Sequence, residues 1–591
     1  MTRDPKQTET QAMMRVPTLV PPDPANFTDK AALYAAYAEF MKKSLAQPRD
    51  GVAEMDFRMR IEAIVYNLIA AELDVSSETL AAERIIPMLK HLDARLVYFA
   101  VRWYKRDLLP LVRVSMPERI IRPVRKIGIF CHYLRDGGAE RCAALLIHEF
   151  IRAGKAVTLF SSEEATASDY AVPEKADRVV LNKLPHERRA QLEIELEARK
   201  IDTCIFFDHA EWRTANDILS ARAAGARIIA MEHNFYSYPW AVGRPGIAID
   251  RECVYPAADI ITVLSRTDRE TWRANGFRQA VYLPNPPTFE ADEVRPNEGK
   301  DAKTLLFVAR LTARKGAEKA IDVLNLVRRK HPSARLLMVG RPDSPSYDQF
   351  LRNKVSESGL NGAVEFTGQT PDISQYYEKA SVLIMPSQME GFPMTLMEAK
   401  AHGLPSVLFA MPYLEAAHAG CIQTPQGDTA AMADAVSKLF EDPERLRQLG
   451  EEAKKSLETF SRKSVREQWM RIFSYLEGAI PEDVMFAVPD GAEERLNLLT
   501  AGIQEQHRWQ TNLLKNPVFL EEIGEKTREE YLSRHPVMHL IDRLHRRMPR
   551  AADRFNRVFR AIFRGLLLKK LYRGITRKIS AAERNGFPPY D

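Results

Sequence analysis

The chain has 591 residues, a formal net charge of +6 and ordinary shares of apolar and charged residues, so it is long enough for three or four globular domains. Its five cysteines are scattered, with no C-x-x-C pair and no Cys/His cluster at metal spacing, so neither a disulfide framework nor a structural zinc is indicated. The first residues lack the apolar core of a signal peptide, and no run is long enough to span a bilayer. We therefore expect a cytoplasmic protein without a transmembrane segment.

Residues 1–121 are predicted to form a helical N-terminal extension. Apolar residues recur there at helical spacing, as at Leu33, Tyr37 and Phe40, and again between Ile61 and Ile69. No residue of this segment points to chemistry. We expect a packing extension, and a role in oligomerisation or in binding an acceptor substrate is the alternative.

Short apolar strands alternate with helical stretches in two consecutive series, separated by a polar, charged linker at 295–303. This alternation predicts an α/β fold with two doubly wound, Rossmann-like domains, which we place at 122–295 and 296–480. Ligands of open α/β sheets bind at the carboxyl ends of the strands, so two facing domains create a cleft. The strands are expected at 127–131, 157–160, 204–207, 228–231 and 260–263, and then at 305–308, 336–339, 364–366, 382–385 and 407–409.

Two adjacent glycines follow the first strand, in the string Gly137-Gly138-Ala139-Glu140-Arg141 that leads into a helical run. Paired glycines between strand and helix let the backbone approach a ligand closely and expose the helix amino end to a phosphate. We assign Gly137 and Gly138 to the cleft. Glu140 either contacts an acceptor or balances the helix dipole, and the sequence leaves both interpretations open.

Two glutamates stand eight residues apart across a Gly-Phe-Pro turn in the second domain. The apolar run 381–387 predicts a buried strand and 395–402 a helix, so Glu390 lies at the end of the strand. Exposed N–H groups at the helix start favour an anion, and Glu398 can accept hydrogen bonds from a vicinal diol such as a ribose. This suits a nucleotide-sugar donor, and two glutamates on a solvated helix are the alternative. The predicted donor-binding residues of this segment are Gly391, Phe392, Pro393, Met394, Thr395 and Glu398.

The Glu390 to Glu398 string resembles the donor-site signature of the family 4 retaining glycosyltransferases, in which two glutamates grip the sugar and the ribose. The Gly-Gly-Ala-Glu-Arg string resembles the opening motif of the same family, in a branch rich in enzymes that extend lipid-linked oligosaccharides. The two domains resemble the GT-B architecture, and the stretch 460–473 resembles the helix that crosses back to the first domain in such enzymes. The resemblance covers roughly the central three-fifths of the chain, 126–473.

The resemblance also assigns residues outside these two motifs. Arg310 and Lys315 lie where family members hold the donor diphosphate, and a basic surface loop is the alternative. Gly368 and Gln369 end a strand where relatives hold the base through backbone groups. His233 follows a strand where relatives place a histidine that touches the donor sugar or its phosphate, and a structural hydrogen bonder is the alternative. The predicted catalytic residues are therefore Arg310, Lys315, Glu390 and His233.

These assignments imply a retaining hexosyl- or N-acetylhexosaminyl-transferase that moves a sugar, from a UDP-sugar, to a glycan or lipid-linked glycan acceptor in cell-surface polysaccharide biosynthesis. The sequence has no Asp-x-Asp motif that would hold a metal on the diphosphate, and the resemblance implies no metal and no other cofactor. The alternatives are a GT-B epimerase or hydrolase that acts on nucleotide sugars, and a glycan-binding scaffold without turnover.

Residues 481–591 are predicted to form a basic, helical C-terminal extension. Between 540 and 579 there are thirteen Lys/Arg against two Asp, and Phe559, Ile562 and Phe563 share one helical face. Such a basic amphipathic helix at 550–579 suits an anionic membrane surface, which would place the enzyme on the inner face of the cytoplasmic membrane. Docking on the protein's own core is the alternative. Nucleic acid is disfavoured, because no recognition fold accompanies the charge.

Overall fold

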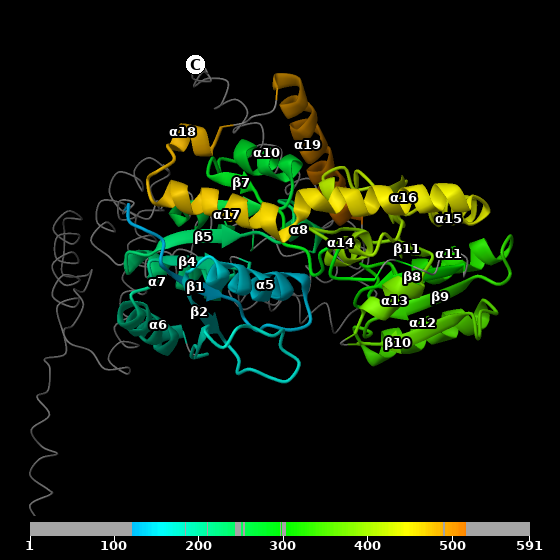
Figure 1. Cartoon of the computed structure of the whole chain (residues 1–591), viewed down its shortest axis with the longest axis horizontal. Coiled ribbons are helices and arrows are strands. Elements are labelled where there is room, and N and C mark those ends of the chain that lie inside the picture. The colour runs from blue at the N-terminus through cyan, green and yellow to red at the C-terminus, as the bar shows by residue number, and fades with distance from the viewer. Residues whose placement is uncertain are drawn as a thin grey trace, which may run out of the picture. The chain divides into compact units, whose positions relative to one another are not determined.

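A computed structural model of the chain describes residues 121–515, with gaps at 184, 210, 243–246, 248–249, 252–253, 296, 298–302, 371 and 488–490. These residues form two parallel sheets with helices on their faces, and both sheets belong to one compact unit of the chain (Figure 1). The predicted α/β class with two doubly wound domains is confirmed. The predicted extension 1–121 lies almost wholly outside the described residues, as does the basic segment 550–579.

The first sheet has seven strands in the order β3-β2-β1-β4-β5-β6-β7, and every neighbouring pair is parallel. Its central strands are almost completely buried, because helices cover both faces of a parallel sheet. The strands are β1 (Lys126–Phe130), β2 (Ala156–Ser161), β3 (Asp177–Val180), β4 (Thr203–Phe206), β5 (Arg227–Met231), β6 (Ile260–Val263) and β7 (Ala280–Tyr282).

The second sheet has six strands in the order β10-β9-β8-β11-β12-β13, again all parallel. In each sheet the order reverses beside the first strand, at β1/β4 and at β8/β11, which is where open α/β sheets bind ligands. The strands are β8 (Thr304–Val308), β9 (Arg335–Val339), β10 (Val364–Gly368), β11 (Val382–Met385), β12 (Ser406–Phe409) and β13 (Cys421–Thr424).

Helices fill the connections between the strands. Those of the first domain are α5 (Gly138–Arg152), α6 (Pro185–Arg199), α7 (Trp212–Ala223), α8 (Tyr238–Ala241), η4 (Tyr255–Ala257) and α10 (Arg266–Ala274). Those of the second are α11 (Ala317–Arg328), α12 (Pro345–Glu357), α13 (Ser374–Lys379), α14 (Met394–Ala401), η5 (Glu415–Ala417), α15 (Thr429–Glu441), α16 (Pro443–Ser456) and η6 (Leu457–Phe460). The chain continues with α17 (Arg462–Leu476), α18 (Glu482–Met485) and α19 (Ala492–Lys515). Among the helices described here, none combines the length and apolar character needed to cross a membrane.

The chain returns to the first domain through α17, which continues the line of α16 in Figure 1. Trp469 and Phe473 of α17 belong to the hydrophobic core of the first domain. The Trp469 ring meets Phe150 of α5 edge-on at 5.0 Å between centroids, and Arg466 forms an ion pair of 2.7 Å with Glu149. The expected crossing helix is therefore present, and it ties the domains together independently of the 295–303 linker.

Candidate functional site

A cleft of about 510 Å³ lies between the carboxyl edges of the two sheets. Loops that follow β1, β4 and β5 line it from the first domain, and loops that follow β8, β9, β10 and β11 line it from the second. Gly368 is the one predicted site residue that is not in its wall, although Gln369 beside it is. The predicted residues that line the cleft are Gly137, Gly138, His233, Arg310, Lys315, Gln369, Glu390, Gly391, Phe392, Pro393, Met394, Thr395 and Glu398.

The paired glycines lie where the first domain meets the second. Gly137 is the N-cap of α5, and a Cβ atom there would lie 1.9 Å from the Glu140 carboxylate. A Cβ atom on Gly138 would lie 3.2 Å from the Met394 side chain at the start of α14. Glu140 thus folds back over the amino end of its own helix, which favours the helix-end interpretation of this residue.

Lys315 and Glu390 form an ion pair on the second-domain side of the cleft. The Lys315 ammonium donates to both carboxylate oxygens, at 2.8 and 2.7 Å. Gly316, the residue after Lys315, has a φ of +75° and packs directly on Pro386. A Cβ atom at position 316 would lie 2.1 Å from the Pro386 carbonyl oxygen, so glycine is needed for the Lys315 loop to come this close to the Glu390 segment. The sequence placed both charges in the cleft but did not predict that they pair with each other.

Arg310 is exposed in the same wall and has no hydrogen bond or ion pair within the part of the chain that the structure describes. Across the cleft, burial raises the pKa of Glu140, and the charge of Arg310 opposes that rise. The two domains therefore present opposite charges to each other here, and the guanidinium remains available to an anionic ligand.

The amino end of α14 faces the cleft and adds the positive potential of its helix dipole to the charges of Arg310 and Lys315. The first N–H groups of a helix have no intrahelical partner, so those of Met394 and Thr395 can bind an anion. Gly391, just before the helix, touches the first domain: a Cβ atom there would lie 2.0 Å from the carbonyl oxygen of His233. Any side chain at this position would push the two domains apart.

Glu398 is buried on α14, with 2 % of its surface exposed, and it accepts three hydrogen bonds. One oxygen accepts from Arg141 of α5 and from the hydroxyl of Thr288, each at 2.8 Å. The other oxygen accepts from the Tyr377 hydroxyl at 2.7 Å. The sequence singled out Glu398 but missed these partners, and the only signal was that Arg141 belongs to the Gly-Gly-Ala-Glu-Arg string.

The loop that carries His233 is anchored by a buried ion pair. Glu232, directly after β5, accepts hydrogen bonds from Arg251 and from the Tyr255 hydroxyl. Burial raises the pKa of Glu232, but the charge of Arg251, the nearby His209 and the Tyr255 hydroxyl together outweigh burial and lower the pKa to about 2. Arg251 also donates to the Tyr236 carbonyl oxygen at 3.0 Å, so the ion pair fixes both ends of the segment.

The His233 ring stacks on Phe207, with 5.3 Å between centroids, and lines the cleft. Burial lowers its pKa to about 4, with a further contribution from the nearby His209. Both ring nitrogens are buried without a hydrogen-bond partner in the described residues. A neutral imidazole with two unused nitrogens can accept a hydrogen bond from one ligand group and donate to another. The nearby His209 is instead held by Asn234 at 3.2 Å and lies 3.7 Å from the Glu232 carboxylate.

Asp208 is a cleft residue that the sequence did not single out. It follows β4 by two positions and lines the first-domain wall. Burial, and then the charge of Glu140, raises its pKa to about 7. A carboxyl group that titrates near neutrality in a cleft is a functional candidate, and nothing in its local sequence distinguishes it from an ordinary loop aspartate.

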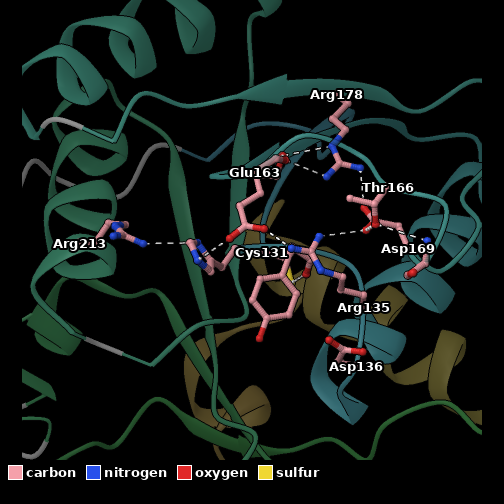
Figure 2. A network of polar contacts seen from close by, with 12 residues as sticks. Cys131, Arg135, Asp136, Glu163, Thr166, Asp169, Arg178 and Arg213 are labelled. Atoms are coloured by element: carbon pink, nitrogen blue, oxygen red, sulfur yellow. Dashed lines mark hydrogen bonds and ion pairs between the residues drawn. The ribbon is translucent and has the colours of Figure 1, made fainter. Parts of the chain in front are cut away.

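A network of charged side chains fixes the loops after β1 and β2, as Figure 2 shows. Arg135 pairs with both Glu163 and Asp169, and Arg178 donates to Asp169 at 2.9 Å and to the Glu163 carbonyl oxygen at 3.0 Å. These charges compensate one another, so the network positions the first-domain rim of the cleft. The sequence missed it because the contacts join the loop after β1 to the loop after β2 and to Arg178 of β3. Within the described ranges, no group of three His, Cys, Asp or Glu side chains is placed to hold a metal ion.

Two protein-family models match consecutive parts of the chain. The model for glycosyltransferase family 4 matches residues 136–286, and the model for glycosyl transferases group 1 matches residues 288–456. Together the two models cover just over half of the chain and identify it as a glycosyltransferase of the group 1 and family 4 type. The resemblance drawn from the Glu390 and Gly137 motifs is thereby confirmed, since each motif lies inside one of the matched ranges.

Individual relatives are distant. An uncharacterised glycosyltransferase of Haemophilus influenzae is 25% identical over 367 residues, which is 59% of this chain and 100% of the relative. An exopolysaccharide phosphotransferase of Streptomyces coelicolor is 28% identical over 49% of this chain, which spans 30% of that protein. A GDP-mannose-dependent phosphatidylinositol monomannoside mannosyltransferase of Mycobacterium tuberculosis is 27% identical over 32% of this chain and 53% of its own length.

Solved structures show the fold. HepE of Anabaena, crystallised with UDP and glucose, matches 59% of this chain and 99% of its own at 16% identity and a TM-score of 0.51. TarM of S. aureus matches 59% of this chain and 99% of its own at 12% identity and a TM-score of 0.50. The two facing domains are accordingly of the GT-B type.

We expect His233 to stay neutral from pH 7 down to about pH 4, because its folded-state pKa lies below the usual value of about 6.5. The unfolded chain takes up this proton first, so the contribution of the neutral ring to stability is complete above pH 6.5 and is lost as the pH falls toward 4. NMR titration of the histidine C2–H signals, with His233→Asn to assign the resonance, measures the pKa. A midpoint above pH 6 would contradict the buried, neutral imidazole.

Proposed function

We propose that this protein is a retaining glycosyltransferase that moves a hexosyl or N-acetylhexosaminyl group from a UDP-sugar to a glycan or lipid-linked glycan acceptor. The observation that carries the proposal is the convergence in one cleft of Arg310, Lys315 and the amino end of α14 with Glu390 and Glu398. Cations and helix N–H groups suit a diphosphate, and carboxylates suit the hydroxyls of a sugar and a ribose.

The named relatives support a nucleotide-sugar donor and a surface-polymer product. HepE binds UDP and glucose, and the mycobacterial relative uses GDP-mannose, so UDP and GDP are the two nucleotides to compare. The Streptomyces relative is named for exopolysaccharide. We therefore place the activity in cell-surface polysaccharide biosynthesis.

In the proposed reaction the bond between the sugar C1 atom and the diphosphate oxygen breaks, and negative charge develops on the departing diphosphate. Lys315 uses two N–H groups on Glu390 and keeps a third for a phosphate oxygen, while Arg310 is free of other partners among the described residues. Both cations stabilise the transition state more than the ground state. The diphosphate oxygen then takes the proton of the acceptor hydroxyl on the same face, and the new C1–O bond forms with retained configuration.

Glu390 orients sugar hydroxyls in this scheme and is not a covalent nucleophile. Its carboxylate is paired with an ammonium at 2.7 Å, which lowers its nucleophilicity. His233 would serve as a neutral hydrogen-bonding group toward the sugar. We propose that no metal and no other cofactor takes part, because the protein's own cations and α14 would carry the charge of the diphosphate.

The experiment that tests the function is incubation of the full chain with labelled UDP- and GDP-sugars and a lipid extract, in the presence of EDTA. We expect label to enter the lipid or glycan fraction with retention of the anomeric configuration. Epimerised or hydrolysed donor without transfer would favour the nucleotide-sugar epimerase or hydrolase, and binding without any turnover would favour the scaffold. Transfer that requires added Mg²⁺ or Mn²⁺ would contradict the metal-free scheme.

Arg310→Ala is expected to lower kcat by about 10²–10³, because one preorganised group is removed from the developing charge. Lys315→Ala should have an effect of similar size, but it also leaves the buried Glu390 without its ion pair, so melting temperatures are needed for both variants. Arg352→Ala is the matched control, since this arginine pairs with Asp348 within α12, away from the cleft. Near-normal transfer by a folded Arg310→Ala variant would refute the assignment.

We further propose that residues 550–579, outside the described residues, bind the enzyme to the anionic inner face of the cytoplasmic membrane. Basic side chains contribute about 1 kcal/mol each near such a surface, in addition to the inserted apolar face. Replacing Phe559, Ile562 and Phe563 with Ser should abolish co-sedimentation with anionic vesicles, and neutral vesicles are the control. Failure of the wild-type protein to co-sediment with anionic vesicles would overturn the membrane location. A much lower melting temperature of the triple Ser variant would favour docking of the segment on the protein's own core.

A further inference from the structure

Glu398 belongs to the second domain, but its charge is compensated from the first. Within the described residues, Arg141 is the one cation within ion-pair distance of the Glu398 carboxylate, at 2.8 Å. The other two donors, Thr288 and Tyr377, are neutral hydroxyl groups. Arg141 lies in the first turn of α5, 257 positions away in the sequence, so this contact exists only when the two domains are together.

The first domain holds the Arg141 side chain in place independently of Glu398. The guanidinium lies over the ring of Tyr170, 4.7 Å from its centroid. Tyr170 is itself tied to the loop after β1, since its backbone N–H donates to the Leu134 carbonyl oxygen at 2.6 Å. The arginine is therefore already oriented toward α14 before a ligand binds, which reduces the conformational entropy lost on binding.

The hydrogen-bonding capacity of Glu398 limits what it can do for a ribose. A carboxylate offers about four acceptor positions, and a vicinal diol brings two donors. Three positions are occupied, so one remains for a single hydroxyl of the diol, and the carboxylate must be rotated correctly to receive it. Without Arg141 the buried carboxylate would lose its ion-pair partner, and only the two neutral hydroxyl groups of Thr288 and Tyr377 would fix its rotation.

We propose that Arg141 is a donor-positioning residue: its guanidinium holds the Glu398 carboxylate in the orientation that receives a hydroxyl of the donor ribose. Recognition of the ribose then depends on both domains, although the carboxylate comes from only one. This inference rests on the proposed function, because it assumes that the cleft binds a nucleoside diphosphate.

A merely structural tie between the domains would also be weakened by loss of Arg141, so the test must report on the ribose itself. Binding of UDP and GDP to the full chain is measured by calorimetry, and the tighter nucleotide is compared with its 2′,3′-dideoxy analogue. The variants are Arg141→Ala and Arg141→Lys. The lysine variant keeps the positive charge but loses the planar guanidinium that lies over Tyr170. Arg152→Gln is the matched control, because it removes a charge from the same helix where the partner is Glu149, one turn away.

We expect Arg141→Ala to lower the affinity for the ribonucleotide by about tenfold, which is the loss typical of one charged hydrogen bond. The affinity for the dideoxy analogue should stay unchanged. Arg141→Lys should fall between Arg141→Ala and the wild type, and Arg152→Gln should match the wild type. In turnover with a donor sugar, KM for the donor should rise by the same factor while kcat changes less.

Two results would overturn the inference while the proposed function stands. One is unchanged ribonucleotide affinity in Arg141→Ala. The other is an equal loss for the ribonucleotide and the dideoxy analogue, which would make Arg141 a structural tie. A wild type that binds neither UDP nor GDP would refute the proposed function as well. If Arg141→Ala does not fold, Arg141→Lys carries the same comparison.

Discussion

The approach of Gly391 to the carbonyl oxygen of His233 is the constraint on which the site depends. A Cβ atom at this position would lie 2.0 Å from that oxygen, so only glycine lets the start of α14 touch the first domain. The contact brings the amino end of α14, Glu390 and Glu398 against the loops after β1 and β5. The crossing helix α17, packed on Phe150 through Trp469, holds the two domains near enough for the contact to form.

Pairing of buried charges is the second constraint on the structure of the site. The carboxylates of Glu232, Glu390 and Glu398 are nearly inaccessible to solvent, and each is met by a cation from a different part of the chain. An unpaired carboxylate in such surroundings costs several kcal/mol, so these pairs constrain the fold as well as the chemistry. Arg310 is different, because it is exposed in the cleft wall with no ion-pair partner among the described residues. Its charge is therefore the one most readily available to a diphosphate.

The two walls of the cleft differ in electrostatic character. The second-domain wall combines cations with a helix amino end, which suits a departing diphosphate. The first-domain wall carries the half-buried carboxyl groups of Glu140 and Asp208, both with raised pKa, beside a neutral His233. Hydrogen-bonding groups of this kind suit the hydroxyls of a sugar. The charge network of Arg135, Glu163, Asp169 and Arg178 keeps the rim of this wall in place without contributing net positive charge.

The sequence by itself determined the fold class and the position of the chemistry along the chain. Buried strands such as β4, β5 and β11 contain uninterrupted apolar runs, and the motifs begin where those runs end. Three strands were missed, β3, β7 and β13, because they are short edge strands: β3 begins with two charged residues, β7 has only three residues, and β13 is mostly partly exposed. Their pairing with a neighbouring strand, and not their own composition, makes them strands.

Only the tertiary structure decided which side chains act together. Arg141 and Glu398, or Lys315 and Glu390, are ordinary charges in their local sequence, and docking of distant segments turns them into buried ion pairs. The neutrality of His233 and the raised pKa of Asp208 have the same origin, since desolvation depends on everything packed around a group. Periodicity is a local property and can be read from the chain, whereas burial and charge pairing are properties of the assembled domains.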